Sequence, residues 1–206
     1  MIDLLRRAVV VPVLTIDSAE QAVPLARALA LGGLTVLEVT LRTDAALEAM
    51  TRIVGEVEGV VVAAGTVLSR RDLDRAAKAG AAFAVSPGLT RDLVEPHPLP
   101  LTPGVATASE IMTGLEAGLT AFKFFPAIPA GGAAVLQAWS SPFPQARFCP
   151  TGGVHAGNAA SLLALPNVLC VGGAWVAPKG LIDACAWDEI TRLATAAAAL
   201  ADSAQP

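Results

Sequence analysis

Apolar runs and amphipathic stretches alternate along the whole chain. The runs are short and rich in Val, Ala and Leu, as in parallel strands that are buried on both faces. The stretches between them repeat apolar positions with the period of an α-helix, and Ser18-Ala-Glu-Gln21 is predicted to open one of them as a capping box. After a short N-terminal helix we predict strands near residues 9–14, 36–41, 60–65, 82–86, 99–103, 119–124, 147–151 and 168–172, and helices near 18–31, 44–56, 69–79, 107–117, 131–139, 157–164 and 180–200.

This order of elements predicts the fold class. Strands that alternate with helices along 206 residues favour an α/β protein whose parallel strands close into a (β/α)8 barrel, with residues 1–206 as one domain. The alternative is an open, doubly wound sheet. That alternative is disfavoured because no G-x-G-x-x-G motif follows the first predicted strand.

Composition and charge narrow the choice of partners. The net charge is −4, and no basic run is present, which argues against nucleic acid and against an anionic membrane surface. Residues 148–178 carry no Asp, Glu, Lys or Arg, but prolines and two Gly-Gly pairs interrupt them, so a buried core region is expected rather than a membrane span. No signal peptide is predicted. The three cysteines lack metal spacing and are expected to be buried thiols of a cytoplasmic protein.

Lys123 is the most unusual residue of the chain. It is one of only three lysines, and it lies in Ala121-Phe-Lys-Phe-Phe-Pro126 among three of the six phenylalanines. An ammonium in apolar surroundings loses hydration, so the pKa of Lys123 is expected to fall from a reference near ~10.4. A lysine that is neutral near pH 7 can form a Schiff base with a carbonyl substrate. A lysine that only reaches the surface from an edge strand is the alternative.

The strand at 36–41 has a matching polar face. Glu38, Thr40 and Arg42 alternate with apolar residues, so they share the face that would point into a barrel. Lys123 and Phe125 likewise share one face of their strand, and we place Lys123 inward. An acid and a neutral lysine in one lumen are what carbon–carbon bond chemistry through an imine requires. The alternative for Glu38 is a structural ion pair with Arg42.

Glycine-rich loops predict a phosphate site. Thr151-Gly152-Gly153 and Gly172-Gly173-Ala174 follow the seventh and eighth predicted strands, where such barrels bind phosphate through backbone N–H groups. Thr66 and residues 86–88 complete the rim at the ends of two other strands.

Metal chemistry is poorly supported by the sequence. The only histidines are His97 and His155, and neither has an acid at ligand spacing. His97, between two prolines, is expected to be solvated, and His155 to cap or pack against the next helix. Neither a metal nor another cofactor is predicted.

The motifs taken together resemble the class I family of 2-keto-3-deoxy-6-phosphogluconate (KDPG) aldolases and 4-hydroxy-2-oxoglutarate (KHG) aldolases. They occur in order over nearly the whole chain, at Leu37–Thr43, Ala64–Leu68, Val85–Thr90, Phe122–Ala127, Phe148–Gly153 and Cys170–Trp175.

The resemblance implies a cytoplasmic, trimeric barrel that cleaves KDPG, a keto acid, to pyruvate and glyceraldehyde 3-phosphate in the Entner–Doudoroff pathway. It implies that Lys123 is the Schiff-base residue and Glu38 the general acid and base. The remaining implied residues are Arg42 and Thr66 for the pyruvyl carboxylate, Pro87 and Phe125 for the pocket wall, and Thr151, Gly152, Gly153, Gly173 and Ala174 for the phosphate end.

One residue departs from the family pattern and leaves the substrate open. Ala174 stands where the best-known members carry Ser, so one neutral hydrogen bond to phosphate is missing, worth about 0.5–1.5 kcal/mol. An aldolase of the same mechanism that acts mainly on KHG, or on an epimeric phosphosugar acid, is therefore an alternative. A phosphate-binding barrel without imine chemistry, such as an isomerase or a transferase, and a binding barrel without turnover are others.

Overall fold

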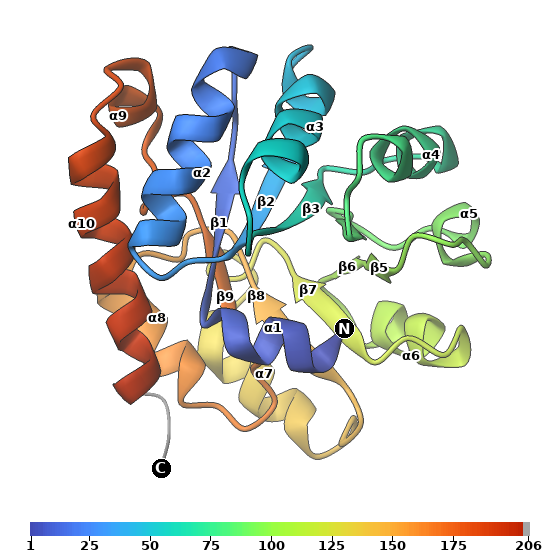
Figure 1. The fold of residues 1–206 in the computed structure, drawn as a ribbon. Helices are drawn as coiled ribbons and strands as arrows, with labels where there is room; N and C mark the ends of the chain where they lie inside the picture. The colour runs from blue at the N-terminus through green and yellow to red at the C-terminus, as the bar shows by residue number, and fades with distance from the viewer. Residues whose placement is uncertain (204–206) are drawn as a thin grey trace.

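The computed structural model describes residues 1–203, and its strands and helices alternate along the chain (Figure 1). The strands are β1 (Val10–Leu14), β2 (Val36–Thr40), β3 (Val61–Gly65), β4 (Phe83–Val85), β5 (Leu101–Thr102), β6 (Gly104–Val105), β7 (Ala121–Phe124), β8 (Arg147–Pro150) and β9 (Val171–Gly173). The α-helices are α1 (Ile2–Ala8), α2 (Ala22–Leu31), α3 (Ala46–Glu56), α4 (Arg70–Lys78), α5 (Arg91–Val94), α6 (Ala108–Glu116), α7 (Gly132–Ser140), α8 (Ala156–Leu163), α9 (Lys179–Asp183) and α10 (Trp187–Ala198), and the 3-10 helices are η1 (Ala19–Gln21) and η2 (Ala199–Ser203).

The strands are parallel and close into a barrel. One set is ordered β5-β4-β3-β2-β1-β9 and the other β6-β7-β8. The two sets are joined where β5 runs into β6 and where the bridges Phe148–Val168 and Thr151–Gly172 connect β8 to the chain at β9. Since β5 and β6 occupy one position, the barrel has the predicted (β/α)8 architecture.

In place of the fifth predicted strand, residues 99–103, the structure has two short strands, β5 and β6, on either side of Pro103. Proline has no N–H to donate to a ladder, so Leu101 and Thr102 pair with β4 while Gly104 and Val105 pair with β7. The Pro103 carbonyl still accepts a hydrogen bond from the Lys123 backbone N–H at 2.8 Å. Pro103 therefore separates two short strands that together fill one position of the barrel.

Two apolar layers hold the barrel together. The larger cluster lies between the strands and the helices and includes Leu37, Val39, Phe122 and Phe124. The smaller cluster fills the lumen, and Leu5 of α1 belongs to it. Helix α1 lies at the end of the barrel where β1 begins, so it closes the amino-terminal end of the lumen (Figure 1). At the other end, where the strands terminate, the side chains that point into the lumen are available to bind and convert a substrate.

Two helix predictions were wrong in detail. Ser18 forms no capping box, because its hydroxyl donates to the Glu20 carboxylate instead of capping a backbone N–H. The predicted helix at 180–200 is two helices, α9 and α10, separated at Cys185, which has the left-handed φ of 52°. Within residues 1–203 no helix is long and apolar enough to cross a membrane.

Candidate active site

Glu38 and Lys123 meet in the barrel lumen. Glu38 lies in the middle of β2, between Leu37 and Val39, which face the helices. Lys123 lies in β7, four strand positions from β2 in either direction around the barrel. The Lys123 Nζ donates a hydrogen bond to Glu38 Oε1 at 2.9 Å. The lumen therefore brings together the two residues that we predicted to carry the chemistry.

Aromatic packing outside the barrel explains why Lys123 points inward. The Phe122 ring packs against Phe148 with centroids 6.0 Å apart, and Phe124 packs edge-on against Trp139 at 5.1 Å. Successive side chains of a strand point to opposite faces. Because Phe122 and Phe124 are held in the outer layer, Lys123 must face the lumen, as the sequence predicted.

The pair is buried and mutually compensated. The Lys123 side chain is 5% exposed and that of Glu38 4% exposed. A buried charge is costly unless it is paired. Each residue of this pair therefore compensates the cost of burying the other. Gly65 of β3 makes room for the carboxylate, since a Cβ there would lie 2.4 Å from Glu38 Oε1. Among residues 1–203, Glu38 forms no ion pair with Arg42, which removes the structural alternative for Glu38.

Arg42 is bound to Thr66 at the carboxyl ends of β2 and β3. The Arg42 Nε donates to Thr66 Oγ1 at 3.0 Å. Thr66 has a φ of 57°, a left-handed conformation that is rare for a β-branched residue and that concentrates at functional sites. This contact orients the Arg42 guanidinium.

A cavity of about 270 Å³ lies at this end of the barrel, and Lys123 lines it. The Lys123 Nζ lies 5.4 Å from the centroid of the Phe125 ring, which forms one wall. Most of the predicted site residues are here, together with three that the sequence did not single out. The predicted ones are Arg42, Lys123, Phe125, Thr151, Gly152, Gly153, Gly173 and Ala174, and the additional ones are Val13, Val154 and Trp175.

The two glycine loops, which the sequence predicted to bind phosphate through backbone N–H groups, are closely packed. Gly152 and Gly153 adopt φ values of 98° and 75°, which favour glycine. Gly173 is covered by Trp175, since a Cβ at Gly173 would lie 2.1 Å from the indole ring. The only feature of the sequence that could have pointed to Trp175 as a cavity residue is its position directly after Gly172-Gly173-Ala174.

Three predicted residues lie outside this cavity lining: Glu38, Thr66 and Pro87. Glu38 is connected to the cavity by its hydrogen bond with Lys123. Thr66 does not line the cavity, but its hydroxyl accepts a hydrogen bond from Arg42, which does. Pro87 packs with its backbone against Gly104, where a Cβ would lie 2.2 Å from the Pro87 carbonyl oxygen. In this structure Pro87 therefore supports the strand next to β7 and does not form a wall of the cavity around Lys123.

The cysteines differ in exposure. Cys149 and Cys170 are buried as expected, whereas the expectation was wrong for Cys185, which is exposed at the break between α9 and α10. A hydrogen bond with Cys149, together with burial, raises the pKa of Cys170 well above its ordinary value. The Cys170 thiol is thus protonated at neutral pH and is no base for the lumen.

The histidines have structural contacts. The expectation that His97 is solvated was wrong: its side chain is 9% exposed, its Nδ1 accepts from the Leu99 N–H at 3.0 Å, and its Nε2 lies 3.2 Å from Asp74 Oδ1. His155 caps α8, as one prediction had it, by accepting from the Gly157 N–H at 3.1 Å. Within residues 1–203 no group of three or more His, Cys, Asp or Glu side chains could hold a metal ion.

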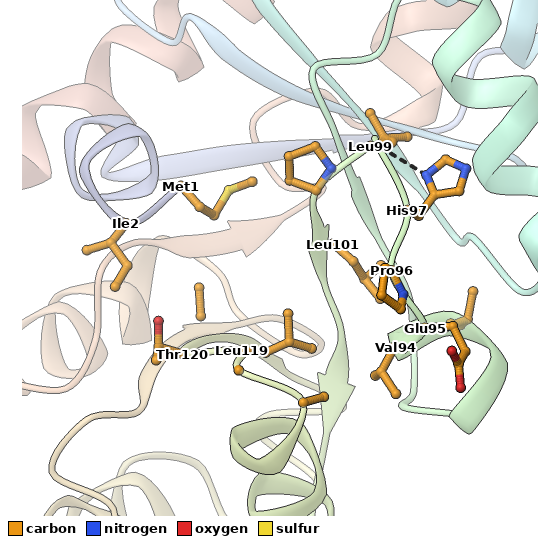
Figure 2. Close-up of a pocket in the computed structure, with 15 residues that line it drawn as sticks. Met1, Ile2, Val94, Glu95, Pro96, His97, Leu99, Leu101, Leu119 and Thr120 are labelled. Carbon is orange, nitrogen blue, oxygen red and sulfur yellow. Dashed lines mark hydrogen bonds between the residues drawn. The ribbon is translucent and has the colours of Figure 1, made fainter.

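A larger cavity, of about 430 Å³, lies at the opposite end of the barrel (Figure 2). Met1, Val94, Leu99, Leu101 and Leu119 give it a largely apolar lining, and the dashed line in Figure 2 is the bond between Leu99 and His97. Of these residues, Val94 and Leu99 precede β5, Leu101 begins it, Leu119 precedes β7, and Met1 is the start of the chain. Barrel enzymes carry their chemistry at the carboxyl ends of the strands, so the smaller cavity around Lys123 is the candidate active site.

The fold and the site define the class. A (β/α)8 barrel in which a buried lysine and carboxylate meet beneath a cavity with a guanidinium and two glycine loops has the parts of a Schiff-base lyase.

Comparison with known proteins gives the family. The family model for KDPG and KHG aldolase matches residues 1–193. The KHG/KDPG aldolase of Escherichia coli is 50% identical over 188 residues, 90% of this chain and 88% of that protein. The chain therefore belongs to the KDPG and KHG aldolase family.

Two solved structures agree in fold. A KDPG aldolase from Legionella pneumophila, with pyruvate captured at low pH as a covalent carbinolamine intermediate, is 45% identical with a TM-score of 0.92, covering 95% of this chain and 97% of its own. The KDPG aldolase of Zymomonas mobilis with 3-phosphoglycerate is 51% identical with a TM-score of 0.91, covering 97% and 95%.

Proposed function

We propose that this chain is a metal-independent class I aldolase that cleaves KDPG to pyruvate and glyceraldehyde 3-phosphate through a Schiff base on Lys123. The observation that carries the proposal is the buried Lys123–Glu38 pair at 2.9 Å beside the 270 Å³ cavity. The captured pyruvate carbinolamine of the Legionella relative supports imine chemistry in the family.

The pair is arranged for the proton transfers that an imine requires. Glu38 accepts the proton that the Lys123 ammonium must lose, and the amine then attacks the C2 ketone. Loss of water gives an imine that draws electrons from the C3–C4 bond. The C4 hydroxyl loses its proton to a base as that bond breaks, and the aldehyde leaves. The remaining enamine is protonated at C3, and hydrolysis releases pyruvate and returns the lysine.

The other residues hold the two ends of the substrate. Arg42, oriented by Thr66, binds the C1 carboxylate as a charge-assisted pair. Phe125 packs against the substrate chain, and Pro87 supports the wall behind it. The phosphate lies against the backbone of Gly152, Gly153 and Gly173, beside Thr151 and Ala174.

A direct assay of pyruvate release tests the proposal. KDPG, its C4 epimer and KHG are compared by kcat/KM with a lactate dehydrogenase couple, with and without EDTA. The proposal requires the largest kcat/KM on KDPG and no effect of EDTA. A larger value on KHG or on the epimer would favour the alternative substrates with the same mechanism.

We also propose that residues 1–206 form one barrel domain that assembles as a cytoplasmic homotrimer, as the family resemblance implies. The solution mass by light scattering distinguishes a trimer from a monomer or a dimer.

Ala174 offers a test of where the phosphate lies. Its methyl group lines the cavity beside Gly173. Ala174→Ser adds a hydroxyl there, so KM for KDPG is expected to fall about 2–10-fold, the span of one neutral hydrogen bond. KHG has no phosphate and serves as the matched control, with an unchanged KM. Equal changes for both substrates, or none for either, would place the phosphate away from Ala174.

A further inference from the structure

A second, much smaller cavity lies in the lumen on the other side of the Lys123–Glu38 pair. Its volume is about 10 Å³, and both residues of the pair line it. Leu5 of the closing helix α1 also lines it, so it lies between the pair and the closed end of the barrel. The remaining lining residues are Val11, Phe83, Val85, Thr102 and Cys149.

Thr102 brings a hydroxyl to this cavity that has no partner in the protein. The residue is 2% exposed, and its backbone is held in β5, paired with Val85 of β4. Among the residues that the structure describes, Thr102 Oγ1 and Asn167 Oδ1 are the only buried side-chain nitrogen or oxygen atoms without a hydrogen bond. Most buried hydroxyls bond to protein or to ordered water, because an unpaired one loses its hydration without compensation. The Thr102 hydroxyl therefore requires a partner.

We propose that one buried water molecule occupies this cavity, bound by Thr102 Oγ1, Glu38 and Lys123, and that Thr102 is thereby a positioning residue for the catalytic pair. A volume of about 10–15 Å³ is what a single water needs, and such a water needs two to four polar partners. The cavity supplies three. The hydroxyl can donate or accept, the carboxylate accepts, and the Lys123 ammonium has N–H groups left after its bond to Glu38 Oε1.

The water links Thr102 to the chemistry without any contact with the substrate. Thr102 is absent from the lining of the 270 Å³ cavity, whereas Lys123 lines both cavities. When a proton moves between Lys123 and Glu38, the number of hydrogen-bond donors and acceptors on each group changes. A water that both donates and accepts satisfies the pair before and after the transfer, and the Thr102 hydroxyl fixes its position. Thr102 should thus affect kcat and leave KM alone.

A matched pair of variants tests this inference. Thr102→Val keeps the shape of the side chain and removes the hydroxyl, while Thr102→Ser keeps the hydroxyl. With one hydrogen bond lost, kcat of Thr102→Val on KDPG should fall about 2–10-fold with an unchanged KM. Its Tm should fall by about 2–4 °C, because the water and the catalytic pair lose a partner. Thr102→Ser should keep kcat close to that of the unmodified protein.

Two results for these variants would overturn the proposal. If the hydroxyl is dry and unpaired, Thr102→Val removes a buried polar cost, so Tm rises and kcat stays unchanged; that result overturns the proposal. Equal losses of kcat in Thr102→Val and Thr102→Ser would assign the effect to packing and also overturn it. Should Thr102→Val not fold, a high-resolution crystal structure of the unmodified protein decides. Density for a water about 2.7–3.2 Å from Thr102 Oγ1 supports the proposal, and a hydroxyl bonded to the main chain contradicts it.

Discussion

Lys123→Met is expected to abolish cleavage of KDPG, with kcat lower by a factor on the order of 10⁴–10⁶, the scale for loss of a covalent nucleophile. Methionine has a similar length but no amine, so no imine can form and the C3–C4 bond has no electron acceptor. Steady-state release of pyruvate measures the loss. The matched control is Lys78→Met, because Lys78 is exposed at the end of α4, far from the lumen, and this variant should keep full activity.

Stability must be measured with activity in this variant. Removing one partner of a buried pair leaves the other charge uncompensated and costs about 3–5 kcal/mol. The double variant with Lys123→Met and Glu38→Gln keeps the lumen neutral, so it should melt higher than the single variant and be just as inactive. Unchanged activity in a folded Lys123→Met protein would favour a phosphate-binding barrel without imine chemistry.

Glu38→Gln is expected to lower kcat by about 10²–10⁴-fold, the contribution of general acid–base catalysis. The amide keeps the length of the side chain and its place beside Gly65, but it cannot accept the Lys123 proton. The same change at Glu58, an exposed residue after α3, is the control and should have no effect. Circular dichroism and Tm confirm the fold of both variants.

A Glu38→Gln protein with near-normal turnover would make Glu38 only a structural counter-ion of Lys123. Borohydride trapping separates the two roles further. If Glu38 moves protons, pyruvate should still form an adduct with Glu38→Gln, but more slowly, because the lysine that reacts is intact.

The alternation of elements was enough to predict the barrel, because strand and helix periods are local properties. The errors arose where a single residue decides the outcome. Pro103 divides the fifth strand because it lacks an N–H, and its effect on two neighbouring ladders depends on pairing that is set far away in the chain. The left-handed Cys185 interrupts the last helix although nothing in its Ala-rich surroundings indicates a break.

The inward direction of Glu38 and Lys123 was predictable because side-chain parity is a strict rule within a strand. Glu38 and Lys123 lie 85 residues apart, yet each had to face the lumen once its apolar neighbours faced the helices. Parity fixes only the face of a strand on which a side chain lies, so it could not predict the 2.9 Å between Lys123 Nζ and Glu38 Oε1.

Residues that act through contacts between distant segments were missed or misplaced. Thr102 gave no signal because its unpaired hydroxyl is visible only in three dimensions. His97 was expected to be solvated, but its partner Asp74 lies in α4, 23 residues earlier. Trp175 packs on Gly173 through a turn that the sequence left undefined.

The central claim is that Lys123 forms the imine, and borohydride reduction in the presence of pyruvate tests it most directly. Reduction should fix one pyruvate-derived carboxyethyl group on the protein and inactivate it. Because trypsin does not cut at a modified lysine, the adduct should appear in a single peptide that spans residues 92–147. An adduct on Lys78 or Lys179, or no adduct on an enzyme that cleaves KDPG, would contradict the account.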